Sequence, residues 1–160
     1  MNPLTQALSL PVSETHFVGA LVIAAVLGAF LGLERSIAGK HAGMRTYALV
    51  SMGSCLFVVI GTLSSLQLAF FSGINPVQIA GSIVIGIGFI GAGLSSLRGG
   101  DTHAELTTAT GIWLAAGVGM ACGFGFYLLA LASTVMGLII FSLFLKFENS
   151  IRDKYGTGKN

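Results

Sequence analysis

Charge is what this sequence lacks most. Lys, Arg, Asp and Glu together make up 9% of the 160 residues, whereas 54% are hydrophobic. A soluble domain is usually near a quarter charged, because its surface must stay solvated. Several apolar runs here approach or exceed the length needed to cross roughly 30 Å of hydrocarbon. The composition therefore excludes an ordinary soluble domain and predicts an all-α, polytopic membrane bundle.

Cysteine is also scarce, and the common catalytic motifs are missing. Cys55 and Cys122 lie in apolar runs without metal-ligand spacing, and two cysteines do not make a disulfide framework. The sequence has no Walker motif, no HExxH and no nucleophile–base pair, so we do not expect an enzyme. No series of Asp, Glu or His crosses the apolar runs, which argues against a proton-coupled pump within one subunit.

Five apolar runs organise the chain. We predict spans at about 17–33, 47–66, 77–97, 106–122 and 124–145, within one transmembrane unit of residues 16–145. A polar N-terminal tail (1–15) and a polar C-terminal tail (146–160) flank this unit. No Lys or Arg precedes the first run, so a cleaved signal peptide is not expected. Residues 106–145 carry no charge and are too long for one ordinary span, so we divide them into two.

The basic residues predict the orientation of the chain. In a five-span arrangement all eight fall on one side: Arg35, Lys40, Arg45, Arg98, Lys146, Arg152, Lys154 and Lys159. Cytoplasmic loops of membrane proteins carry the excess of Lys and Arg. We therefore expect the N-terminus outside and the C-terminus in the cytoplasm.

The connection between the first two spans holds the first candidate site. Glu34 and Arg35 end the first apolar run, and Arg45 opens the second. In one interpretation Glu34 forms a packed ion pair with Arg35 or Arg45 and has a structural role. In the other, Glu34 faces a water-filled or ion-binding cavity, since ionisable groups at membrane depth are costly and tend to be functional. We favour the ion pair.

A second acidic cluster lies on the same predicted side of the membrane, at Asp101, His103 and Glu105. Glu34, Asp101 and Glu105 could together offer three carboxylates to a divalent cation, and Mg²⁺ often uses only one or two. The alternative is a solvated loop in which Asp101 or Thr102 caps the next helix and Glu105 complements its dipole. We favour the alternative for any single residue. No resident cofactor is expected, and Mg²⁺ is the one ligand or substrate candidate.

Glycine, in contrast, is abundant, with 23 residues. Small residues recur every four positions in the first and fourth spans, and the third span contains GIGFIGAG. A dinucleotide-binding glycine motif follows a β-strand, and no strand is expected before this one. We therefore reject a dinucleotide-binding site here. The pattern predicts close helix packing, with local unwinding of the third span as an alternative. The packing positions are Gly28, Gly32, Gly86, Gly88, Gly91, Gly93, Gly111 and Gly119.

Four motifs resemble the MgtC/SapB family of bacterial inner-membrane proteins. They are GLER at 32–35, AGMRTYALV at 42–50, GIGFIGAG at 86–93 and LTTATGIWLAAGVGMACG at 106–123. The resemblance covers about residues 17–145 and implies a five-span hydrophobic domain. It places functional weight on Glu34, Arg35, Gly43, Arg45, Thr46, Gly88, Gly91, Gly93, Thr107 and Thr108.

There are departures from the family pattern. The chain resembles the shorter, SapB-like form, which lacks the C-terminal soluble domain of the family's namesake. The third span of family members usually has a Gln and a Ser where this chain has Ser82 and Ile85. A transport path along this span would therefore have fewer polar side chains. In the family, a basic residue followed by Gly often precedes the LTTA motif, whereas this chain has Ala104 and Glu105 there. The difference adds an acidic side chain on the predicted cytoplasmic side.

The resemblance also implies a function. Family members are linked to growth in low magnesium and, for the namesake, to survival inside host cells. They are described as magnesium transporters or as acting on a magnesium-transporting ATPase or the F-type ATP synthase. We predict an inner-membrane protein that supports adaptation to low magnesium through another membrane complex. The alternatives are an oligomeric transporter or channel for Mg²⁺ or another small solute, and a purely structural unit. We expect a homo-oligomer in the lipid bilayer and no nucleic-acid partner.

Overall fold

The computed structural model describes residues 14–67, 75–96 and 102–155 and confirms an all-α bundle. Five helices lie in this part of the chain: α2 (Glu14–Ile37), α3 (Met44–Gln67), α4 (Pro76–Ser96), α5 (Thr102–Gly123) and α6 (Tyr127–Tyr155). Among the described residues, four apolar segments are long enough to cross a membrane: Thr15–Ile37, Met44–Ser65, Pro76–Leu94 and Leu106–Gly123. The apolar part of α6, Tyr127–Leu143, is shorter.

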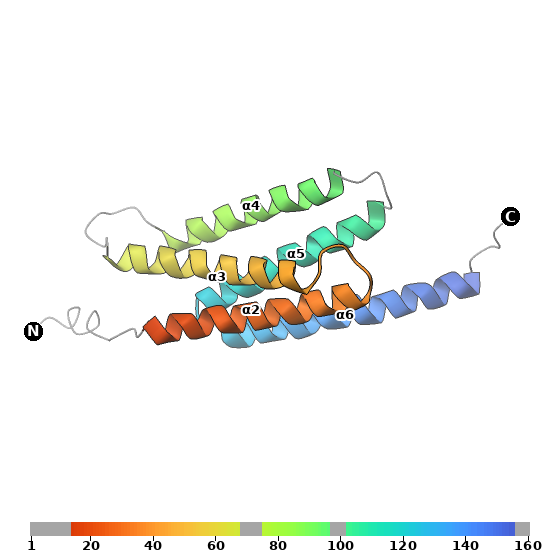
Figure 1. Cartoon of the computed structure of the whole chain (residues 1–160), viewed down its shortest axis with the longest axis horizontal. Helices are drawn as coiled ribbons and strands as arrows, with labels where there is room; N and C mark the ends of the chain where they lie inside the picture. Colours follow the sequence, from red (N-terminus) through yellow and green to blue (C-terminus); the bar gives the residue numbers. More distant parts are fainter. Residues whose placement is uncertain (1–13, 68–74, 97–101, 156–160) are drawn as a thin grey trace, which may run out of the picture.

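Successive helices run in opposite directions (Figure 1). The segment 38–43 between α2 and α3, here called the hinge, lies at one end of the bundle. The C-terminal end of α4 and the start of α5 lie at this same hinge end, and α6 extends beyond it (Figure 1). Arg35, Lys40 and Arg45 are therefore all near the hinge end.

Two glycines in the left-handed conformation end helices. Gly39 has φ +68° and follows α2, while Gly125 has φ +81° and follows α5. At the second site, the Phe126 N–H donates to the Ala121 carbonyl at 2.8 Å and the Gly125 N–H donates to the Cys122 carbonyl at 3.0 Å. The same pair of bonds recurs after α2, and together they satisfy carbonyls that the helix leaves free. Glycine suits both positions because it has no Cβ to clash there.

Side-chain caps fix the starts of α3 and α4. The Ser36 hydroxyl accepts a hydrogen bond from the Met44 N–H at 3.1 Å and donates to the Gly32 carbonyl at 3.0 Å. It therefore satisfies a free donor of α3 from the end of α2. Asn75 accepts from the Val77 N–H at 2.9 Å, and Pro76 occupies the first position of α4, where no N–H is needed.

Helix α5 is central and α4 is peripheral. Among the five described helices, α5 packs against each of the others, whereas α4 contacts only α3 and α5. The apolar segment of α5 is 44% buried and that of α4 only 6%. Most of α4 therefore faces the surroundings of the protomer.

Glycines allow α2, α3 and α5 to approach at backbone distance. A Cβ placed on Gly28 would lie 2.6 Å from the Tyr47 carbonyl oxygen, and one on Gly32 would lie 2.6 Å from Met44 Cα. From the other side, a Cβ on Gly119 would overlap the Ser51 carbonyl oxygen and lie 2.9 Å from Ser51 Cα. Helix α3 is thus held between α2 and α5 with no room for a methyl group at these points.

The glycines of α4 behave differently. A Cβ on Gly91 would meet Ala109 Cβ of α5 at 3.4 Å, an ordinary close contact. The corresponding positions at Gly86, Gly88 and Gly93 have no described atom of another element within 4 Å. These three glycines therefore make no close contact with another described helix of the protomer, because α4 lies at the edge. Their role in helix packing stays a prediction. Helix α4 is also continuous, so the structure shows no local unwinding there.

Candidate functional site

A buried arginine marks the candidate site. Among the side chains that the structure describes, only Arg35 is both charged and buried, with 2% of its surface exposed. It lies in the last turn of α2, where a positive charge complements the helix dipole. Burying a guanidinium is costly unless its charge is paired and its donors are satisfied. The surroundings of Arg35 therefore need a physical explanation.

Two groups compensate for the burial of Arg35. Its Nε donates to Glu34 Oε2 at 2.5 Å, forming an ion pair with the adjacent residue. Its guanidinium carbon lies 3.9 Å from the ring centroid of Phe141 on α6. A guanidinium over an aromatic face is attracted by the ring quadrupole, more strongly where water is excluded. The Arg35 Nη2 atom is buried, and its two N–H groups have no hydrogen-bond acceptor among the described residues.

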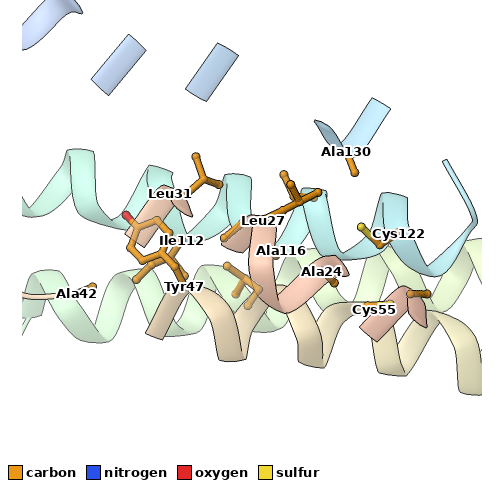
Figure 2. Close-up of a cluster of buried hydrophobic side chains, with 14 of the residues drawn as sticks. Ala24, Leu27, Leu31, Ala42, Tyr47, Cys55, Ile112, Ala116, Cys122 and Ala130 are labelled. Atoms are coloured by element: carbon orange, nitrogen blue, oxygen red, sulfur yellow. The ribbon is translucent and has the colours of Figure 1, made fainter. Parts of the chain in front are cut away.

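Tyr47 and Gly111 complete this arrangement. Tyr47 on α3 is fully buried, and its hydroxyl donates to the Thr108 carbonyl of α5 at 3.3 Å. A Cβ on Gly111 would overlap the Tyr47 hydroxyl and lie 2.8 Å from Phe141 Cζ. The absence of a side chain at Gly111 therefore lets the side chains of Tyr47 from α3 and Phe141 from α6 both lie against α5 at this point. Figure 2 shows the Tyr47 ring beside Ile112. We call Arg35, Tyr47, Thr108, Gly111 and Phe141 the arginine cluster.

Glu34 connects this cluster to a cavity at the hinge end. Its side chain is 17% exposed and lines a cavity of about 430 Å³ between α2 and α6. The other lining residues are Phe30, Leu33, Ile37, Ala38, Leu138 and Ser142. One carboxylate oxygen is held by Arg35. The cavity can therefore present a carboxylate, but one whose charge an adjacent guanidinium already offsets.

Arg45 and Thr46 do not join the arginine cluster. Arg45 is exposed, and it makes no hydrogen bond or ion pair with any residue that the structure describes. Thr46 is partly buried. The sequence left open whether Glu34 pairs with Arg35 or with Arg45. In the structure, Glu34 pairs with Arg35.

The proposed three-carboxylate site falls largely outside the described structure. Asp101 is outside the described residues, and so is the side chain of Glu105. Within the described part of the chain, no group of three or more His, Cys, Asp or Glu side chains could hold a metal ion. A cation site formed by Glu34, Asp101 and Glu105 stays a prediction.

Comparison with known proteins shows the family of the chain. The profile of the MgtC family matches residues 21–150, which include the whole arginine cluster. The chain belongs to the MgtC family. This confirms the resemblance seen in the sequence motifs, and the apolar helices of the bundle identify this MgtC-family chain as a membrane protein.

Several MgtC-family relatives are similar over most of this chain. YhiD of Escherichia coli K12 is 38% identical over 87% of the chain and 65% of its own length. SapB of Bacillus subtilis 168 is 36% identical over 74% of the chain and 52% of its own length. MgtC of Salmonella typhimurium LT2 is 42% identical over 72% of the chain and 47% of its own length. The chain thus spans about half to two thirds of these relatives. No solved structure matches it.

The sequence did not identify every member of the cluster. Phe141 sits among apolar neighbours in the last run, and nothing in its spacing indicates a partner more than 100 residues away. Tyr47 follows directly after Arg45 and Thr46, and it is the one aromatic residue in AGMRTYALV. A polar aromatic residue at the start of an apolar span is the signal that could have found it.

Proposed function

We propose that this MgtC-family chain is a multi-pass protein of the bacterial inner membrane that supports growth at low magnesium by acting on another membrane complex. The link to magnesium is supported by the family and by one relative, which bears the name "Putative magnesium transporter YhiD". The basic residues support an orientation with the hinge end in the cytoplasm. The packing inside the bundle supports the mode of action.

The observation that carries this mode of action is the filled centre of the protomer. Backbones of α2, α3 and α5 meet at Gly28, Gly32 and Gly119. Near the hinge end, Leu31, Tyr47 and Ile112 are completely buried. Mg²⁺ gives up its water shell reluctantly and is usually bound with several waters. Because tight apolar packing offers little to a hydrated ion, a single protomer is better suited to binding a neighbour than to conducting Mg²⁺.

A transporter is the second candidate, and Glu34 is the observation that favours it. Its carboxylate lines the cavity between α2 and α6 at the hinge end. An ion could approach it there, and a path shared between copies in an oligomer would then be needed to cross the membrane. The name of YhiD, which calls that relative a magnesium transporter, also supports this second candidate.

Growth of a deletion strain tests the link to magnesium. Cells without the gene are compared with cells expressing wild-type protein, in limiting and in replete magnesium. The proposal predicts that the protein restores growth only in limiting magnesium. Equal growth of both strains at every magnesium concentration would remove the link.

The first partner to test is the F-type ATP synthase, which the family resemblance suggests. ATP-driven proton pumping is measured in inverted membrane vesicles that contain or lack the protein, at equal synthase content. A change in pumping that follows the amount of added protein supports action on this complex. Unchanged pumping would exclude this partner and direct the search to other membrane complexes.

A further inference from the structure

A second cavity, unrelated to the arginine cluster, lies between α3 and α4. It has a volume of about 570 Å³, within the range of pockets that hold small molecules, about 300–1,000 Å³. Its walls include Leu49, Gly53 and Phe57 of α3 and Gly86 and Ile90 of α4. Leu49 is 63% exposed and Phe57 is 57% exposed, so the cavity is a groove open to the surroundings of the bundle.

The groove exists because α3 and α4 touch at one end only. Toward the end opposite the hinge, a Cβ on Gly61 would overlap Ile79 Cδ1, so the two helices are in direct contact there. Further along, Cβ positions on Gly53 and Gly86 have no described atom of another element within 4 Å. In Figure 1 the two ribbons diverge toward the end where α3 begins. Two glycines thus face open space inside an apolar groove.

Arg45, which has no ion-pair partner among the described residues, lies near the hinge end of the groove. Arg45, Leu49, Gly53 and Phe57 recur every four residues, so Arg45 continues the groove-lining face of α3 by one turn. Arg45 is exposed and forms no ion pair with a described residue. An apolar groove that ends in a positive charge matches the two parts of an anionic phospholipid, an acyl chain and a phosphate headgroup.

We propose that this groove is a binding site for an anionic phospholipid, with one acyl chain between α3 and α4 and the phosphate against Arg45. A second copy of the chain fits the groove less well. A symmetric interface brings the same residues of both copies together, and Arg45 would then face another Arg45 region at the same end. The site is independent of whether the protein transports an ion or regulates another complex.

Native mass spectrometry of the purified full chain tests the proposal. Delipidated protein in mild detergent is titrated with phosphatidylglycerol or phosphatidylcholine of identical acyl chains. We expect one retained lipid and a preference for phosphatidylglycerol on the order of fivefold, the effect of one basic residue at an anionic surface. Binding without a headgroup preference would overturn the role of Arg45.

Matched variants separate the groove from general lipid adhesion. Gly86→Leu fills the groove and should abolish retention, whereas Gly88→Leu, also exposed on α4 but absent from the groove lining, should not. Gly53→Leu fills the groove from the other wall and repeats the test if Gly86→Leu is poorly folded. Arg45→Gln should remove the headgroup preference, and Lys40→Gln should keep it. Equal retention in Gly86→Leu and Gly88→Leu overturns the proposal, as does a wild-type dimer that Gly86→Leu disrupts.

Discussion

The guanidinium carbon of Arg35 on α2 lies 3.9 Å from the ring centroid of Phe141 on α6. This contact joins two residues that are more than 100 positions apart in the chain, at a point where Glu34 supplies the opposing charge. A buried arginine held in this way is a packed structural group as well as a candidate functional one. Stability measurements should therefore detect it directly.

Phe141→Leu should destabilise the bundle by about 2 kcal/mol, because it removes the aromatic face from a desolvated guanidinium while keeping an apolar side chain. The free energy of unfolding is measured by titrating detergent-solubilised protein with SDS. Phe89→Leu on α4 is the matched control, since Phe89 is 82% exposed, and it should change stability little. If Arg35→Met abolishes the effect of Phe141→Leu, the two residues are coupled. Full additivity of the two substitutions would contradict the contact.

Gly119→Ala should strongly disrupt the fold, whereas Gly117→Ala on the same helix should be neutral or stabilising by up to about 1 kcal/mol. A methyl group at Gly119 overlaps the α3 backbone at Ser51, while one at Gly117 meets no described atom within 4 Å. Thermal unfolding in detergent and gel-filtration profiles compare the two variants. Similar stability of both would mean that α3 and α5 are not in backbone contact.

Ser51→Ala should be neutral or stabilising by about 1 kcal/mol. The Ser51 hydroxyl oxygen is buried and has no described hydrogen-bond partner, and an unsatisfied buried polar group is unfavourable. SDS titration again gives the free energy of unfolding. A clear loss of stability in Ser51→Ala would show that the hydroxyl has a partner.

Cys55 and Cys122 should resist modification in the folded protein. Both are free thiols, with 0% and 1% of their surface exposed, on α3 and α5 (Figure 2). A maleimide should label neither in native membranes and both after SDS unfolding. A cysteine introduced at the exposed Ser142 controls for reagent access. Rapid native labelling of either buried thiol would indicate that α3 and α5 separate in the membrane.

The sequence predicted the fold class well because apolar runs and sparse charge determine a membrane bundle almost alone. Its glycine repeats also coincide with close contacts at Gly28 and Gly119. The glycines of α4 could not be distinguished in this way, because the same repeat suits packing inside or outside a protomer. The Arg35–Phe141 contact depends on how α6 folds back onto α2, which no local pattern records. From the sequence, either Arg35 or Arg45 could pair with Glu34. The tertiary structure shows that the ion pair forms with Arg35.

Magnesium flux distinguishes a protein that acts on another complex from one that itself carries the ion. Purified protein is reconstituted in liposomes that contain a magnesium-sensitive dye, and external Mg²⁺ is added with and without an imposed membrane potential. Circular dichroism confirms folding, and an ionophore shows that the dye responds. We expect Mg²⁺ influx equal to that of protein-free liposomes, because the protein acts on another complex. Protein-dependent influx that Glu34→Gln abolishes would contradict it and make the protein a transporter.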